Sequence, residues 1–249
     1  MSALYDRIGR SYRATRRPDP RIAAQIREAL GDARSVLNVG AGTGSYEPTD
    51  REVLAVEPSA TMIAQRPAGS APVVQANAEE LPLPDKSFDA ALAINTIHHW
   101  QDVHRALAEL RRVVRRRIVV FMDDMRQDEE LWLIRRYFPQ LQADADQLSG
   151  IRALLERELG PLREVKVALP ADCTDGLLSA YWRRPEAYLD PTVRANISFF
   201  TRLSEEEIVG GVERLADDLA SGEWDRRYGR LRELPVLHLG HRILVAELS

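Results

Sequence analysis

The sequence predicts an α/β protein with a Rossmann-like, mostly parallel seven-stranded sheet, helices on both faces and a helical lid inserted before the last strand. Three observations predict this fold: apolar runs at α/β spacing, helical periodicity between them, and a glycine-rich turn directly after the first run. The runs are continuous in apolar character, as strands buried on both faces of a parallel sheet should be. They occupy residues 35–40, 52–57, 72–77, 88–95, 117–123, 164–170 and 241–248.

Helices are predicted between and after these runs. Asp102 is placed to cap one of them, and Ser204 with Glu207 has the spacing of a capping box. The connection over residues 40–53 contains Pro48 and is so short that its crossover helix should be vestigial. The expected helices cover about 103–114, 128–138, 147–159 and 205–221.

Composition excludes several classes of protein. The chain has 249 residues, 34 basic and 38 acidic side chains, and a net charge of −4, whereas nucleic-acid binders usually show a basic excess. The single Cys173 permits neither an internal disulfide nor a zinc cluster of cysteines. No run approaches the roughly 18 uncharged apolar residues that span a bilayer. We expect a soluble cytoplasmic protein, a monomer or homodimer, with no metal, nucleic-acid or membrane partner.

A glycine-rich segment, VLNVGAGTGSYE, carries the first functional signal. Gly40, Gly42 and Gly44 let the backbone turn sharply after the first strand and let a ligand approach the main chain. A tight turn with no ligand would use the same glycines, but the second run ends in Glu57, where a carboxylate can accept hydrogen bonds from both ribose hydroxyls. The pair favours a nucleoside-containing cofactor. Ser45 replaces the last glycine of the dinucleotide fingerprint, which argues against NAD.

Four linked motifs cover residues 35–123: VGAGTG, AVEPSATMI, ANAEELPLPDKSFDAALAINTIHHW and DVHRALAELRRVV. In order and spacing they resemble the class I S-adenosylmethionine-dependent methyltransferases, and among these the small-molecule group that includes the ubiquinone and menaquinone biosynthesis enzymes. The resemblance implies S-adenosyl-L-methionine as the cofactor. The cofactor-binding residues that it implies are Asn38, Gly40, Ala41, Gly42, Gly44, Glu57, Pro58, Met62, Asn77, Ala78, Glu79, Asn95 and Thr96.

The same resemblance assigns parts of the cofactor to these residues. The glycine turn would wrap the methionine part and the ribose, and Glu57 would hold the ribose diol. Met62 would pack near the adenine, and residues 77–79 would recognise the edge of the adenine. Asn95 and Thr96 would lie along the sulfonium.

Three positions depart from the family pattern. Asn38 stands where an acidic residue is usual, which weakens a charge-assisted bond to the cofactor's ammonium to an ordinary one. Asn77 stands where Asp is common, although an amide can still bind adenine. The run Arg115 to Arg117 replaces a Pro-Gly-Gly turn, and we interpret it as a solvated helix end favoured by the helix dipole.

Candidate catalytic residues follow the fourth strand. Methyl transfer from a sulfonium needs a base only when the acceptor must lose a proton, and His98 and His99 are the candidates. A packing or capping role for either imidazole is the alternative. Asp123, at the end of the fifth strand, is a candidate substrate contact, and helix capping or solvation is its alternative role.

The acceptor should be framed by the N-terminal segment and the helical insertion. Candidate substrate contacts are Tyr5, Tyr12 and Arg16 from the first, and Tyr181 and Trp182 from the second, where aromatic residues are dense. The same rings would equally serve to dock insertion helices onto the sheet.

The sequence thus predicts one methyltransferase domain over residues 1–249, with an N-terminal cap over about 1–18, a cofactor-binding core over about 19–124 and a lid over about 171–235. Its activity would be methyl transfer to O, N or C of a small, aromatic or partly apolar molecule. The alternative is a fold relative that binds the cofactor but catalyses another reaction or serves as a non-catalytic scaffold.

Overall fold

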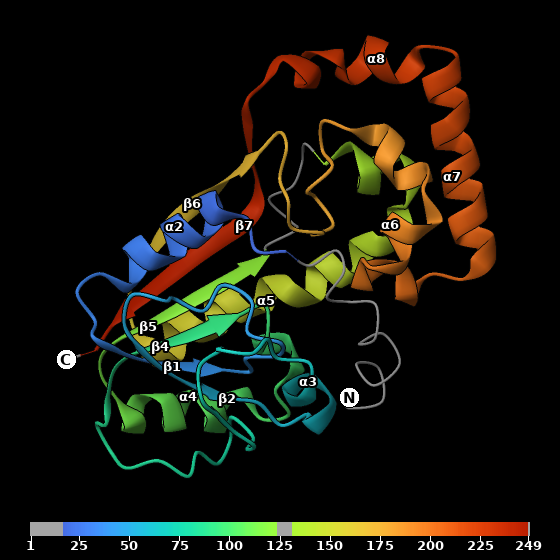
Figure 1. Cartoon of the computed structure of the whole chain (residues 1–249). Helices are drawn as coiled ribbons and strands as arrows, with labels where there is room; N and C mark the ends of the chain where they lie inside the picture. Colours follow the sequence, from blue (N-terminus) through green and yellow to red (C-terminus); the bar gives the residue numbers. More distant parts are fainter. Residues whose placement is uncertain (1–16, 124–130, 249) are drawn as a thin grey trace.

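A seven-stranded sheet in the order β3-β2-β1-β4-β5-β7-β6 forms the centre of the protein (Figure 1). The computed structural model describes residues 17–123 and 131–248, and the side chains of 142–149 are left out of the description. Strands β1 to β5 run parallel, and β7 lies antiparallel between β5 and β6. The strands are β1 Ser35–Val39, β2 Glu52–Val56, β3 Val73–Val74, β4 Phe88–Ile94, β5 Val114–Asp123, β6 Leu162–Pro170 and β7 Val236–Glu247.

Helical segments surround this sheet and fill the connection between β6 and β7. The α-helices are α2 Pro20–Leu30, α3 Ala60–Ala64, α4 Val103–Val113, α5 Gln142–Leu159, α6 Pro191–Ala195, α7 Glu205–Ala220 and α8 Glu223–Tyr228. Short helices of other types are η1 Ile97–His99, η3 Leu133–Tyr137, η4 Pro139–Leu141, η5 Pro185–Leu189, η6 Ser198–Arg202 and η7 Gly229–Glu233. The predicted α/β sheet with a helical insertion before the last strand is confirmed.

The predicted helix caps are also confirmed. The Asp102 carboxylate accepts a hydrogen bond from the Arg105 N–H at 3.0 Å and opens α4. Both bonds of the capping box between Ser204 and Glu207 are formed at the start of α7. Within the predicted helix over 128–138, the structure has a π-helix, η3, at Leu133–Tyr137. Residues 124–130 lie outside the described part.

The interpretation of the arginine run as a helix end is wrong. Residues Arg115 to Arg117 lie within β5, because α4 passes directly into this strand at Val114. The side chains are paired with distant carboxylates: Arg115 with Asp89 at 3.2 Å, Arg116 with Asp32 at 3.0 Å and Arg117 with Glu247 at 3.2 Å. A register shift between Phe88 and Ala90 accommodates one extra residue of β5 beside β4.

The first crossover contains no helix, whereas a vestigial one was predicted. Its residues form turns that lead from β1 to β2. Tyr46, within these turns, is 4% exposed and packs edge-on against Phe121 with ring centres 5.9 Å apart. Its hydroxyl donates a hydrogen bond to Asp175 at 2.7 Å. The loop is therefore anchored to the residues that follow β6.

Apolar side chains cover both faces of the sheet. Along β5, Val119 and Phe121 belong to one buried cluster, with α2 and the insertion, whereas Ile118 and Val120 belong to the cluster that contains α4 and part of α5. This alternation follows from the two-residue period of a strand. The result is a layered α/β arrangement with the sheet in the middle (Figure 1).

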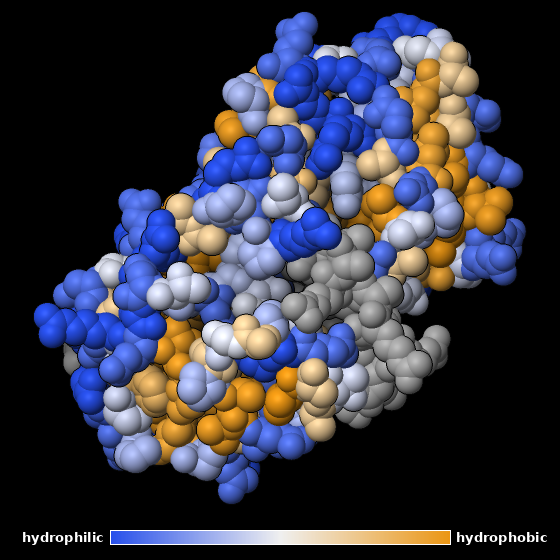
Figure 2. Space-filling view, viewed as in Figure 1, coloured by the Kyte–Doolittle hydropathy of each residue, from blue (hydrophilic) through white to orange (hydrophobic). Residues whose placement is uncertain are grey.

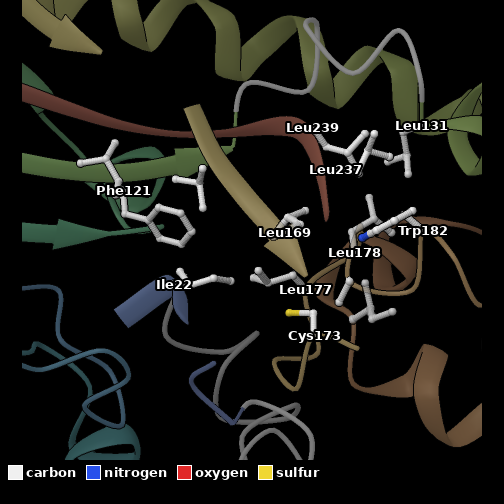
Figure 3. Packing of buried hydrophobic residues seen from close by; sticks show 14 of the residues in the cluster. Ile22, Phe121, Leu131, Leu169, Cys173, Leu177, Leu178, Trp182, Leu237 and Leu239 are labelled. Carbon is white, nitrogen blue, oxygen red and sulfur yellow. The ribbon is translucent and has the colours of Figure 1, made fainter. Parts of the chain in front are cut away.

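Aromatic residues of the insertion pack around Trp132, which precedes β6, and belong to the same core as one face of the sheet. The Trp132 ring lies edge-on to Tyr137, Tyr188 and Trp224, and its Nε1 donates to the Trp182 carbonyl oxygen at 2.9 Å. Figure 3 shows how this side of the core reaches from Ile22 and Phe121 on the sheet side to Trp182 in the insertion. These rings attach the insertion to the sheet.

The insertion leaves and rejoins the sheet at one point. Pro170, the last residue of β6, is paired with Val236, the first residue of β7, and the Ala171 N–H donates to the Pro235 carbonyl oxygen at 2.9 Å. In Figure 2 apolar residues surface over the region of α7, where Val209 is 47% exposed. Within residues 17–123 and 131–248, none of the helices combines the length and apolar character that crossing a bilayer requires.

Asp19 links α2 to the insertion and gives a pH-dependent stability. Burial acts to raise its pKa, but hydrogen bonds from Arg21 and the Thr174 N–H outweigh burial and lower the pKa to about 2. The unfolded value is 3.8, so the stabilisation is complete above pH 3.8 and disappears as the pH falls towards 2.

We therefore expect Asp19→Asn to lower the free energy of unfolding by about 2 kcal/mol at pH 7 and by much less near pH 2. Urea denaturation across this range measures the difference between the two proteins. Asp172→Asn, which removes the exposed second partner of Arg21, should change stability by less than about 0.5 kcal/mol. A difference between wild type and Asp19→Asn that is equal at pH 7 and pH 2 would contradict this assignment.

Candidate active site

A cavity of about 380 Å³ opens at the carboxyl ends of β1, β2 and β4. In an open parallel sheet this edge is where ligands bind, and the volume is that of a small-molecule site. Its lining residues are Asn38, Gly40, Ala41, Gly42, Thr43, Ser45, Glu57, Pro58, Ser59, Met62, Asn77, Ala78, Glu79, Ile94, Asn95, Thr96, His99, Trp100 and Gln101.

The glycine turn brings the main chain against the fourth strand. The N–H groups of Gly40 and Ala41 both donate to the Val56 carbonyl oxygen, at 2.9 and 3.0 Å. Gly40 has a φ of +68°, and a Cβ at this position would lie 1.9 Å from Thr96 Oγ1. The turn therefore needs glycine both for its conformation and for its contact with residue 96.

Glu57 lies at the floor of the cavity, 7% exposed. One carboxylate oxygen accepts from the Gly42 N–H at 2.8 Å and the other from the Ser59 N–H at 2.9 Å. Because a carboxylate offers about four acceptor positions, each oxygen keeps a lone pair for a ligand hydroxyl. The two backbone bonds hold the group in one orientation towards the cavity.

The opposite wall is formed by the loop after β3. Asn77, Ala78 and Glu79 line the cavity there, and Met62 of α3 lines it from the side. Glu79 also accepts hydrogen bonds from the N–H groups of Gln101 at 2.7 Å and Asp102 at 3.2 Å. Glu79 thereby ties this wall to the start of α4.

A second cavity of about 80 Å³ adjoins the first and shares Asn95, Thr96 and His99 with it. It lies between the sheet edge and the insertion. Its other lining residues are Ile97, His98, Val120, Phe121, Met122, Asp123, Ile151, Gly176, Leu177, Leu178, Ile197, Ser198, Phe199, Arg202 and His241.

The two predicted histidines meet at the boundary between these cavities. Their ring centres are 3.9 Å apart. Desolvation, helped by the charge of Arg202, lowers the pKa of His99 to about 4. Desolvation, together with the charges of His99 and Arg202, also lowers the pKa of His98. At neutral pH both rings are uncharged.

Sequence analysis missed His241, which lines the second cavity at 1% exposed. Its Nε2 lies 2.6 Å from Ser179 Oγ and 3.9 Å from Asp123 Oδ2, and its ring stacks on Phe121. His241 faces Asp123 because β7 runs antiparallel to β5 and pairs these two residues. The topology could have indicated this position, because the first residues of an antiparallel strand lie at the edge of the sheet where the parallel strands end.

The structure brings twelve of the thirteen predicted cofactor residues to the larger cavity. The exception, Gly44, faces the side chains of Glu47 and Arg66. Of the predicted catalytic and substrate residues, His98, His99 and Asp123 line the smaller cavity.

Tyr181 and Trp182 are not brought to either of these two cavities. Trp182 is fully buried, and Tyr181 packs its ring against Tyr188 at 5.5 Å. These contacts favour the docking role, which is the alternative for the two rings, because aromatic surface is buried first in a core. Tyr5, Tyr12 and Arg16 lie outside the described residues. Among the residues that are described, no group of three or more His, Cys, Asp or Glu is arranged to hold a metal ion.

Comparison with known proteins gives the family. Residues 37–122 match the methyltransferase domain family. The solved structure of a putative methyltransferase from an antibiotic biosynthesis pathway of Anabaena variabilis is 35% identical, with a TM-score of 0.85 over 94% of this chain and 99% of that one. The chain belongs to the S-adenosylmethionine-dependent methyltransferases, and the predicted resemblance is confirmed.

Other relatives are more distant. A structure from Thermotoga maritima, described as a possible histamine N-methyltransferase, covers the whole chain at 18% identity with a TM-score of 0.59, which shows the shared fold. An uncharacterized methyltransferase of Bacillus subtilis is 28% identical over 42% of this chain, and a malonyl-[acyl-carrier protein] O-methyltransferase of Pseudescherichia vulneris is 32% identical over 46%. These matches span 42% and 49% of the two relatives, which is less than half of each.

The glycine turn yields a stability prediction. Gly69 has a φ of +83° and open space around it. Gly69→Ala should therefore lower the free energy of unfolding only by the strain of a left-handed backbone, about 1–2 kcal/mol. Gly40→Ala adds the clash with Thr96 and should cost about 2–5 kcal/mol, since overpacking typically adds about 1–3 kcal/mol. Chemical denaturation of both variants measures the gap. Equal losses would mean that the turn does not press against residue 96.

Proposed function

We propose that this protein transfers a methyl group from S-adenosyl-L-methionine to O, N or C of a small, aromatic or partly apolar acceptor. The observation that carries the proposal is the pair of adjoining cavities that share Asn95, Thr96 and His99. A nucleoside cofactor in the larger cavity would direct its reactive end across these residues towards the smaller one. We further propose a cytoplasmic monomer or homodimer without a nucleic-acid partner.

The residues of the larger cavity match the polar groups of the cofactor. The free lone pairs of Glu57 suit two ribose hydroxyls, and the glycine turn lets the backbone approach the ligand. Residues 77–79 offer polar groups to an adenine edge, beside the apolar Met62. The bound cofactor supplies a methyl group on a sulfonium that is its own leaving group. The protein's main task is to hold the acceptor in line with this methyl group.

The smaller cavity suits an acceptor with apolar and polar parts. Phe199, Ile197 and Leu177 supply apolar walls, and Asp123 and His241 supply polar atoms at the sheet edge. The volume of about 80 Å³ holds the reacting end of a molecule, so the remainder would extend towards the insertion. This division supports an aromatic or partly apolar acceptor with one polar reacting atom.

His99 is the better placed of the two candidate bases because it lines both cavities. A group with a pKa of about 4 is uncharged at neutral pH and can accept a proton, but it is a weak base. It therefore suits an acceptor whose lone pair is already free, such as a neutral amine, and a hydroxyl acceptor would lose its proton only as the methyl group is transferred. His98 would support the orientation of its neighbour through their ring contact.

A cofactor-binding relative that does not transfer the methyl group is the second candidate function. The neutral Asn38 in place of an acidic residue and the missing first crossover helix favour it. Incubation of the protein and candidate acceptors with methyl-labelled cofactor separates the two functions, because only a methyltransferase moves the label to the acceptor. Binding without any labelled product across phenol, amine and carbon acceptors would favour the second function.

Calorimetry with S-adenosylhomocysteine tests the cofactor site. Wild type should bind this ligand, and Glu57→Ala should lose about 1–3 kcal/mol of binding free energy with the two ribose hydrogen bonds. Glu80→Ala, at a neighbouring carboxylate whose side chain is 86% exposed, should bind as wild type does. Folded wild-type protein that binds neither S-adenosylhomocysteine nor S-adenosylmethionine would overturn the proposed function.

A further inference from the structure

A buried ion pair lies behind the larger cavity. The Arg66 Nη2 atom is 2.8 Å from both carboxylate oxygens of Glu47, and the two side chains are 4% and 8% exposed. Neither residue lines the cavities described above. Burying two charges costs desolvation energy that their attraction often only balances. Stability alone is therefore a weak explanation for this pair.

The pair is built into the glycine turn. Arg66 also donates to the carbonyl oxygens of Gly42 at 3.3 Å and Ala71 at 3.1 Å. A Cβ at Gly44 would lie 3.1 Å from Glu47 Oε2 and 3.3 Å from Arg66 Nη1. The third glycine of the motif thus makes room for the ion pair.

Glu47 fixes the orientation of Asn38. The Asn38 Nδ2 atom donates to Glu47 Oε1 at 3.0 Å. A carboxylate can only accept hydrogen bonds, so the amide nitrogen must face Glu47 and the Oδ1 atom must face away. Asn38 lines the larger cavity, is 1% exposed, and its Oδ1 has no hydrogen-bond partner among the described residues.

A buried acceptor without a partner costs about 1–3 kcal/mol, which a ligand with a hydrogen-bond donor can recover. Among the donors of S-adenosylmethionine, the ribose hydroxyls suit Glu57 and the adenine amino group suits residues 77–79 at the far wall. The ammonium of the amino-acid part is the donor that remains for Asn38 Oδ1.

We propose that Glu47, held by Arg66, is a positioning residue that aims Asn38 Oδ1 at the cofactor's ammonium. This inference rests on the proposed function. The amide at 38 and the acid at 47 depend on each other, because a carboxylate at 38 would face that of Glu47 at about the 3.0 Å of the present contact. Compared with the family pattern, the negative charge is on Glu47, behind the cavity wall, and not on residue 38 in the wall.

The test compares two ligands that share the methylthioadenosine part. S-adenosylhomocysteine carries the ammonium, and 5′-methylthioadenosine lacks the whole amino-acid group. Their dissociation constants are measured by calorimetry for wild type, Glu47→Gln, Asn38→Asp and the double variant. Thermal melting of each protein checks that it is folded. Glu164→Gln is the matched control, because it alters a partly buried carboxylate that is paired with Arg242 and lines neither cavity.

Glu47→Gln should weaken S-adenosylhomocysteine about five- to tenfold, as a net loss of about 1 kcal/mol implies, because an amide at 47 loses one bond to Arg66 and can present either its oxygen or its nitrogen to Asn38, which is then no longer fixed. Binding of 5′-methylthioadenosine should change less than about twofold. Asn38→Asp alone should lower the melting temperature, since two carboxylates then face each other. Adding Asn38→Asp to Glu47→Gln should return S-adenosylhomocysteine affinity to the wild-type value or better, because a charge-assisted bond replaces a neutral one.

Three results would overturn the inference while leaving the proposed function intact. They are an equal loss of both ligands in Glu47→Gln, no recovery in the double variant, and wild type binding the two ligands equally well. Failure of wild type to bind either ligand would instead overturn the proposed function. Glu164→Gln should leave both dissociation constants unchanged.

Discussion

The close contact between Gly40 and Thr96 is the constraint on which the site depends. It brings the ends of β1 and β4 together at one edge of the sheet, and the shared Val56 carbonyl oxygen adds the end of β2. Glu57 follows directly and holds the Gly42 N–H. The cavity is therefore shaped mainly by main-chain geometry, and side chains supply its selectivity.

The two neighbouring cavities are lined by different parts of the protein. The larger belongs to the sheet edge, whereas the smaller needs residues of the insertion such as Leu177 and Phe199. Most aromatic surface of the insertion is used to attach it to the sheet, with Trp132 at the centre. What remains for an acceptor is a small opening with a few polar atoms, among them those of His241.

Local patterns and motifs predicted the strands, the caps of α4 and α7 and most of the residues that line the larger cavity, because the information for these features lies within a few residues along the chain. Contacts between distant segments could not be predicted in this way. The arginines at 115–117 lie in a strand, where Asp32, Asp89 and Glu247, all distant from them in the sequence, balance their charges. His241 and the Glu47 to Arg66 pair likewise depend on topology, which no local motif records.

The pairing of Pro170 with Val236 lets the insertion evolve separately from the sheet. Since the insertion starts and ends at adjacent positions of two paired strands, residues can be gained or lost between them without shifting the register of the sheet. The entropy of closing such a connection grows only slowly with its length, so large changes are tolerated. A lineage with this architecture can exchange the helices of the insertion as a block while the cavity at the sheet edge stays as it is.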